Sequence, residues 1–286
     1  TFLVLFFFPV FFGHMAVNNK DTILAFCHVW IIYLVLKYFK NQNIKEKSKK
    51  YIISIGLLAA TATGIQLFFL GSLAPLFIFI LVEVFFLKKF ITKKFSNKIF
   101  YLDLIKCFLI FYLVLIIFWI EVHSNILISP IIMIQEWFSY DLITGWPWNL
   151  VNGKIYLASN VDANYLLINF IFKSPEYFLL SYIIFLTAIY KIVNFYNINI
   201  NFFTYKIIFI ISILLFPNII LSLIDLPVYD GMRLFLWVVP YLCLIPALTI
   251  YYLIKNISSL KIKLTSLILS LFFVYHFVNF INITPY

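Results

Sequence analysis

Apolar stretches of about 18 to 22 residues recur along the whole 286-residue chain, and they constrain its fold more than any other feature. A helix of that length crosses a hydrocarbon core of roughly 30 Å. Hydrophobic residues make up 64% of the chain and charged residues only 11%, so a water-soluble fold could not bury its apolar surface. The sequence therefore predicts an integral membrane protein that crosses the bilayer several times.

The bilayer also decides the type of secondary structure. Its core holds no water to satisfy backbone N–H and C=O groups, so a crossing segment is a helix or part of a closed barrel. The alternation of roughly ten-residue barrel strands is missing from the sequence. We expect one all-α polytopic transmembrane bundle over residues 1–286 with about eight to nine spans, near 1–12 (partial), 22–39, 51–69, 73–90, 99–120, 175–193, 205–224, 235–254 and 264–282.

The first of these segments is incomplete. Thr1 to Phe12 would form only about 18 Å of helix, which is too short to span a bilayer. It has neither a basic region before it nor a small-residue cleavage site after it, so it does not resemble a signal peptide. We therefore expect the sequence to be truncated at its N-terminus, with at least half a helix missing.

The lysines predict the orientation. Most of them lie in three segments between expected spans, 37–50, 88–98 and 255–263. Under the positive-inside rule these segments face the cytoplasm, which places three others outside: 13–21, 121–174 and 225–234. Eight of the eleven acidic residues lie in or next to the outer segments. The net charge of +10 then reflects cytoplasmic anchoring, and we expect no nucleic-acid partner.

The outer segment 121–174 is far longer than an ordinary bundle loop. It mixes apolar and polar residues, which favours helices that lie along the membrane interface. Cys27, Cys107 and Cys243 each lie in an apolar stretch without metal-ligand spacing, so we expect neither a disulfide nor a zinc site.

The first group of candidate residues lies in the outer segment Gly13 to Asp21, which contains His14, Asn18 and Lys20. Asp21 would stand at the N-terminus of the next helix, where a carboxylate caps free N–H groups and is favoured by the helix dipole. Capping is a sufficient explanation by itself. The neighbouring polar residues also suit a sugar or a phosphate, and His14 with Asp21 leaves a divalent cation open.

The second group is Tyr229-Asp230-Gly231-Met232-Arg233. Arg233 is the single arginine, and it lies on the side where basic residues are rare. A guanidinium matches phosphate with two parallel hydrogen bonds, which a lysine cannot do. An Asp230–Arg233 ion pair that closes a turn at Gly231 is the competing interpretation.

The third group comprises Tyr165 and the run Lys173-Ser174-Pro175-Glu176. Pro175 suits the first turn of the next helix. Lys173 stands just outside that span. Snorkelling to the interface is its ordinary role, and help for Arg233 in neutralising a lipid-linked phosphate is the sharper alternative.

In this order the three groups resemble bacterial members of the GT-C membrane glycosyltransferases, in the branch similar to dolichyl-phosphate-mannose protein mannosyltransferases (glycosyltransferase family 39-like proteins). The family elements are a His with an Asn-x-Lys-Asp helix start, a Tyr-Leu-Pro-like stretch, a Lys-Thr-Pro-Glu run and a Tyr-Asp-Gly-x-Arg-His turn. They match His14, 18–21, 165–167, 173–176 and 229–233.

The match has departures. Leu167 replaces the family proline and Leu234 the family histidine, which weakens any inference about the acceptor. Thr284-Pro285-Tyr286 looks like the start of a His-Pro-Tyr element, so we expect truncation at the C-terminus as well.

The resemblance implies an inverting transfer of a sugar from a polyprenyl-phosphate donor to a glycan, lipid or protein acceptor, on the extracytoplasmic face of the bacterial inner membrane. Asp21 is the implied assisting carboxylate, while the family's main base would precede Thr1. The implied donor-phosphate ligands are Arg233, Lys173 and Lys20. The implied substrate-binding residues are His14, Asn18, Tyr165, Tyr229 and Asp230. No cofactor is required by this scheme, apart from the open divalent cation.

Two other functions fit a chain of apolar spans. A transporter or lipid flippase is favoured by Pro217 and Pro240, which fall inside spans, although related halves and abundant glycines are missing. A non-catalytic membrane scaffold is the third reading. The enzyme hypothesis requires the three outer segments to form one anion-receiving cleft with Arg233 and Asp21 at its rim.

Overall fold

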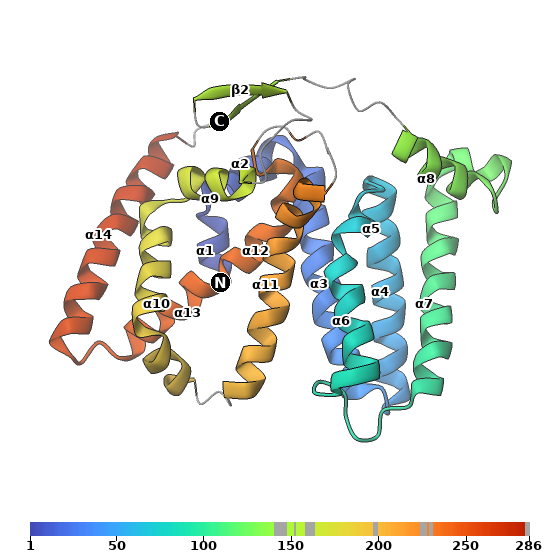
Figure 1. The fold of residues 1–286 in the computed structure, drawn as a ribbon, viewed down its shortest axis with the longest axis horizontal. Helices are drawn as coiled ribbons and strands as arrows, with labels where there is room; N and C mark the ends of the chain where they lie inside the picture. Colours follow the sequence, from blue (N-terminus) through green and yellow to red (C-terminus); the bar gives the residue numbers. More distant parts are fainter. Residues whose placement is uncertain are drawn as a thin grey trace. The chain divides into compact units, whose positions relative to one another are not determined.

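The computed structural model describes residues 1–139, 148–151, 153–157, 164–196, 200–223, 228 and 231–283. In this part of the chain nearly all regular structure is helical, as the sequence predicted (Figure 1). The chain divides into two compact units, Thr1–Thr22 with Trp146–Tyr286, and Ile23–Gly145. The single transmembrane domain expected from the sequence stays a prediction.

The first unit carries the residues singled out for chemistry. Its helices and strands are α1 (Phe2–Phe6), α2 (Pro9–Val17), the start of α3 (Asn19–Asn41), β1 (Trp148–Val151), β2 (Lys154–Leu157), α9 (Tyr165–Lys173), α10 (Glu176–Phe195), α11 (Ile200–Leu223), η4 (Arg233–Val238), α12 (Val239–Leu242), α13 (Leu244–Lys255) and α14 (Leu260–Ile283).

The second unit contains the rest of α3. Its other elements are α4 (Lys45–Ile65), α5 (Phe69–Ser72), α6 (Ala74–Val82), the π-helical turn η1 (Glu83–Leu87), α7 (Asn97–Phe118), the 3₁₀ turn η2 (Ile120–Ser124) and α8 (Ser129–Ser139).

Five helical stretches of the described residues are long and apolar enough to cross a membrane: Asn19–Asn41, Asn97–Phe118, Glu176–Phe195, Arg233–Lys255 and Leu260–Asn282. All five coincide with predicted spans, which supports an integral membrane protein. The predicted spans at 51–69, 73–90 and 205–224 fall on α4, on α6 with η1, and on α11. The total of eight to nine spans stays a prediction.

The N-terminal segment differs from the expected partial span. Thr1 to Phe12 does not form one helix, because α1 ends at Phe6 and α2 begins at Pro9. Proline lacks the N–H that a continuing helix needs, and its ring holds the preceding Phe8 in an extended conformation. The carbonyl of Phe7, at the break, receives a hydrogen bond from Nε2 of His276 at 3.0 Å.

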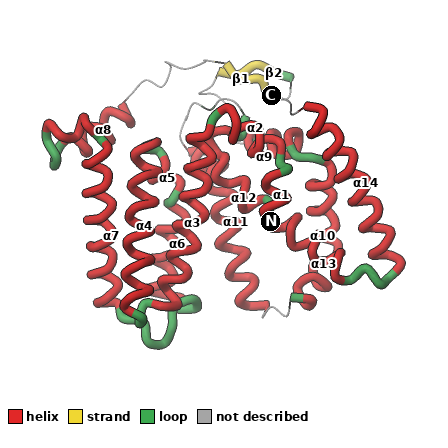
Figure 2. The backbone as a smooth tube through the Cα atoms, turned by 180° about the vertical axis from the view of Figure 1, so that it is seen from behind, coloured by secondary structure: helices red, strands yellow, loops and turns green. Residues whose placement is uncertain are grey.

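The core of the first unit lies where α10 packs against α13 and α14 (Figures 1 and 2). Five of its thirteen described buried members are aromatic, and they come from the N-terminal segment, α10 and α13. Phe8 from the N-terminal break packs its ring against Phe178. The buried members of this core are Val4, Phe8, Tyr177, Phe178, Phe185, Ile192, Met232, Leu236, Val239, Cys243, Tyr252, Leu253 and Leu269.

The stretch Arg233–Lys255 is interrupted by proline. Pro246 has no N–H for the carbonyl of Leu242, four residues earlier. The hydroxyl of Tyr182 on α10 donates a hydrogen bond to that carbonyl at 2.7 Å. A side chain from a neighbouring helix therefore satisfies a group that lipid would leave unpaired.

The second unit is organised around the close pair α4 and α7 (Figure 2). Gly56, Ala60 and Gly64 recur at four-residue spacing on α4, the small-residue pattern that lets membrane helices approach closely. A Cβ on Gly56 would lie 2.9 Å from Cγ2 of Ile110 and 3.0 Å from the carbonyl oxygen of Cys107. Farther along the pair, Nε1 of Trp119 donates to the carbonyl of Gly64 at 3.2 Å.

The described residues of segment 121–174 include helices, as expected, and also a hairpin that the sequence analysis did not anticipate. Strands β1 and β2 pair antiparallel, with Trp148 opposite Leu157 and Val151 opposite Lys154. Two residues join them, and Gly153 has φ +75°. Asn-Gly is a strong signal for such two-residue hairpin loops, so the pattern was present in the sequence.

Candidate functional site

The first group of predicted residues forms a sharp junction between two helices. The expected loop 13–21 is mostly helical: α2 continues to Val17 and α3 begins at Asn19. Asn18 alone stands between them, with φ −142° and ψ 67°. Asp21 lies in the first turn of α3, where a carboxylate is stabilised by the helix dipole, and its side chain accepts a short hydrogen bond from Nδ2 of Asn18.

Arg233 meets this junction from the other end of the chain. Its Nε donates to Oδ2 of Asp21 at 3.2 Å, across 212 positions of sequence. The Asp21 side chain is 4% exposed and the Arg233 side chain 25% exposed. The predicted approach of Asp21 and Arg233 is therefore found inside the first unit. The competing ion pair with Asp230 concerns a residue outside the described part of the chain, as does the prediction for Tyr229.

Lys173 lies at the turn that precedes Arg233. Gly231 has φ +66°, a conformation that favours glycine. An ideal Cβ on Gly231 would lie 1.9 Å from Nζ of Lys173 and 2.8 Å from Oδ1 of Asn169. The ammonium group thus occupies the space that any other residue would need at this turn. It lies against the turn that carries Arg233.

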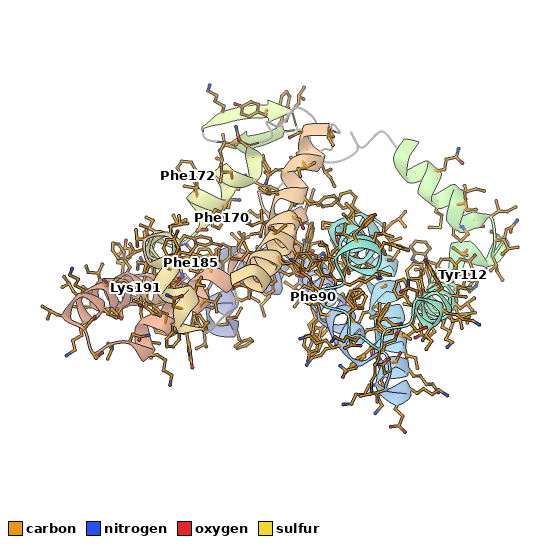
Figure 3. All side chains as sticks on the ribbon, turned by 60° about the horizontal axis from the view of Figure 1, so that its bottom comes forward. Phe90, Tyr112, Phe170, Phe172, Phe185 and Lys191 are labelled. Carbon is orange, nitrogen blue, oxygen red and sulfur yellow. The ribbon has the colours of Figure 1, made fainter. Side chains whose placement is uncertain are left out.

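Helix α9 positions this lysine. Phe170 packs its ring against Phe178 and Tyr182 of α10, whereas Phe172 is exposed, and Figure 3 labels both side chains of α9. Nδ2 of Asn169 donates to the carbonyl of Tyr165 at 2.9 Å, which holds Oδ1 toward Gly231. Asn169 and Lys173 are one helical turn apart, so they share a face.

Met232, next to Arg233 in the sequence, anchors the turn that carries Arg233. Met232 is 2% exposed and belongs to the core of the first unit. Gly231 on one side and Arg233 on the other therefore have little freedom to move. Sequence reasoning missed Met232 and Asn169. The signal for Asn169 was its isolation as a polar residue in the apolar run Tyr165–Lys173, four positions before the lysine.

The remaining predicted residues lie around this centre without a common arrangement. Tyr165 is 1% exposed in the first turn of α9. His14 is half-buried in the last turn of α2, and Lys20 is exposed in the first turn of α3. Among the described residues no group of three or more His, Cys, Asp or Glu side chains could hold a metal ion. The described residues therefore do not provide a set of ligands for the divalent cation that the sequence left open.

The site thus combines two cationic side chains and one buried carboxylate at one turn. No protein-family model, no curated protein and no solved structure matches the chain. The chemistry of the site must carry the argument about function.

Proposed function

We propose that this protein is an integral membrane glycosyltransferase that moves a sugar from a polyprenyl-phosphate donor to an acceptor on the extracytoplasmic face of a bacterial inner membrane. The observation that carries the proposal is the meeting of Asp21, Lys173 and Arg233 at the Gly231 turn. Three motifs distant in sequence supply one group each. A resemblance between sequence motifs does not by itself require these side chains to lie close together, so their approach is additional support.

The cations suit the leaving group of such a transfer. The acceptor oxygen attacks the anomeric carbon of the sugar, the bond from that carbon to the phosphate oxygen breaks, and its electron pair leaves with the phosphate. Charge grows on the phosphate in the transition state, and fixed donors there lower the barrier. Arg233 offers a planar fork and Lys173 a point charge.

The carboxylate suits the acceptor. A hydroxyl that attacks must lose its proton, and a carboxylate within hydrogen-bond reach accepts it. Asp21 is the carboxylate next to the proposed phosphate ligands, and we assign it the assisting role.

The position of the site suits a lipid-linked donor. Lys173 ends α9, and the membrane-length helix α10 begins at Glu176. The proposed phosphate ligands therefore stand beside the end of a span, at the depth where a polyprenyl phosphate presents its head group. Lys191 and Lys255 lie near the C-terminal ends of α10 and α13, and Lys261 and Lys263 lie in the first turn of α14, as the expected orientation requires.

One observation favours the transporter or flippase alternative. The stretch Arg233–Lys255 is broken into η4, α12 and α13 around Pro240 and Pro246, and discontinuous helices are typical of transporter sites. Helix α11, in contrast, continues past Pro217. Both functions would use a phosphate site at Arg233. They differ in whether the bond between sugar and phosphate is broken.

The test measures release of polyprenyl phosphate from decaprenyl-phosphate donors that carry mannose, glucose or galactose, in membranes containing the protein. Arg233→Ala should lower the rate by about 10²-fold, the scale for one lost transition-state donor. Arg233→Lys should remain strongly impaired because a point charge does not form the bidentate fork. Lys191→Ala, an exposed lysine on α10, is the matched control.

The outcomes separate the hypotheses. Release that depends on Arg233 and not on Lys191 supports the transferase. Movement of intact donor across the membrane without release supports the flippase. Wild-type rates of release in Arg233→Ala would refute the phosphate role.

A further inference from the structure

The carboxylate of Asp21 is a fixed anion in the position where the proposed phosphate must bind. Its Oδ2 receives the Nε hydrogen of Arg233 at 3.2 Å and the amide of Asn18. The Asp21 side chain is almost fully buried, while a quarter of the Arg233 side chain is accessible. An incoming anion that reaches the accessible part of this side chain therefore meets an arginine that already holds a carboxylate.

The guanidinium cannot serve both anions through the same edge. Its side-on fork consists of Nε–H and one Nη–H, the geometry that matches a carboxylate or a phosphate. Asp21 uses the Nε–H of this fork. A phosphate that takes this side-on fork must displace the carboxylate. Two anions within hydrogen-bond distance of the same fork would repel each other in a partly desolvated site.

We propose that Asp21 occupies Arg233 in place of the donor phosphate, and that donor binding exchanges the carboxylate for the phosphate. The proposal rests on the proposed function, since it concerns the same phosphate site. Before the donor binds, Asp21 offsets the positive charge of Arg233. In the occupied site the phosphate does so, and the carboxylate is released.

The exchange sets an order of events. While Oδ2 of Asp21 accepts hydrogen bonds from Arg233 and Asn18, it is not positioned to receive the proton of an acceptor hydroxyl. Once released, Asp21 stays close to the donor because it remains in the first turn of α3, next to Asn18. The carboxylate that assists the acceptor becomes available only after the donor has bound.

The exchange predicts that removing the charge of Asp21 strengthens phosphate binding rather than weakening it. Asp21→Asn keeps the shape of the side chain and removes the competing charge. The full chain in lipid nanodiscs should bind farnesyl phosphate about tenfold more tightly after this change, because the phosphate no longer has to displace a charged carboxylate. A tenfold change in affinity corresponds to about 1.4 kcal/mol of binding free energy. Inorganic phosphate should show the same direction, and neutral farnesol should show no change. Asp21→Glu, which keeps a carboxylate, should bind close to the wild-type level.

Two controls keep the test sharp. Asp103→Asn removes a carboxylate that also pairs with a cation, at 8% side-chain exposure, in the second unit, and it should leave farnesyl phosphate binding unchanged. Asn18→Ala loosens Asp21 without removing its charge and should tighten binding by less than Asp21→Asn. Thermal unfolding of each variant shows whether it is folded.

The results distinguish failure of this proposal from failure of the phosphate site. If Arg233→Ala weakens farnesyl phosphate binding and Asp21→Asn weakens it or leaves it unchanged, the ion pair is structural and the exchange is wrong. If Arg233→Ala has no effect on binding, the proposed function and the exchange fail together. Tighter binding in Asp21→Asn with loss in Arg233→Ala supports both.

Discussion

The two units of the chain solve the problem of helix packing in opposite ways. In the second unit α4 lies close against α7 through Gly56, Ala60 and Gly64, and both helices run without a break. In the first unit the helices are interrupted, and side chains such as Tyr182 and His276 satisfy the backbone carbonyls exposed at the breaks. The unit with the interrupted helices is also the one that carries the ion pair of Asp21 and Arg233.

Polar residues follow the same division. In the second unit Asp103 accepts hydrogen bonds from Tyr38 at 3.0 Å and Ser48 at 3.2 Å, which joins α3, α4 and α7 through one fully engaged carboxylate. In the first unit Asp21 and Arg233 stand at a turn, with a quarter of the arginine side chain accessible. The first arrangement holds helices together, and the second leaves room for a ligand. We expect substitutions in the two units to separate stability from binding.

The largest effect is expected for Gly56→Leu. The nearest atoms include the carbonyl oxygen of Cys107 and Cβ of Ile110, each 3.0 Å from an ideal Cβ, and backbone of α7 cannot move aside without separating the helices. We expect a loss of about 3 kcal/mol in the free energy of unfolding, the upper range for overpacking. Thermal unfolding in detergent measures it. Gly71→Ala, where a Cβ would meet nothing within 4 Å, is the control and should change stability much less.

Gly231→Ala should affect activity more than stability. The atom closest to a new Cβ is Nζ of Lys173, the end of a flexible side chain, so the ammonium moves away rather than the backbone. We expect about 1 kcal/mol of backbone strain from the positive φ, and about tenfold slower donor cleavage because a cation leaves the phosphate site.

Gly153→Ala separates the two contributions. Gly153 also has a positive φ but has open space at its Cβ, so it should show the strain without the loss of activity. In a double-substitution cycle, Gly231→Ala should cost little further activity once Lys173 is already alanine. Equal losses of activity at Gly153 and Gly231 would contradict the role of Lys173.

These comparisons show which parts of the fold could be read from the sequence. The helix positions could, because membrane-length apolar runs leave the backbone no alternative. The approach of Asp21 and Arg233 could be expected as well, since both were assigned to the same face. The direct ion pair could not, because side-chain contacts across 212 positions depend on packing that no local pattern encodes.

The helix breaks in the first unit could be predicted from the sequence only in part. Pro9 was visible in the sequence, yet its effect on Thr1–Phe12 was missed because apolar length outweighed the rule for proline. The hairpin around Gly153 was missed because segment 121–174 was interpreted only in terms of interfacial helices, and the Asn-Gly pair was not weighed as a hairpin signal. Asn169 was overlooked because a lone amide in an apolar run carries no motif. Its role depends on Gly231, which is distant in sequence.

Tyr182→Phe tests whether side chains stabilise the breaks. The substitution removes the hydroxyl that donates to the carbonyl of Leu242, and Pro246 offers no substitute donor. We expect a loss of about 1 kcal/mol in the free energy of unfolding, within the range for hydrogen bonds between membrane helices. Tyr190→Phe, at a tyrosine that is 83% exposed on the same helix, should change it very little. A difference of zero between the two variants would mean that the freed carbonyl finds another partner.

The smallest effect is expected for Lys106→Met in the second unit, and it sharpens the contrast with Arg233. Nζ of Lys106 lies 3.1 Å from Oδ1 of Asp103, but the lysine side chain is 64% exposed. An exposed pair three residues apart on one helix contributes little to stability, so its loss should cost no more than about 0.5 kcal/mol. Asp103 keeps its bonds to Tyr38 and Ser48. Replacing Arg233 instead leaves Asp21 buried with its cationic partner gone, which costs more. Thermal unfolding of Lys106→Met beside Arg233→Met gives the ranking, and a larger loss at Lys106 would show that exposure does not separate the two ion pairs.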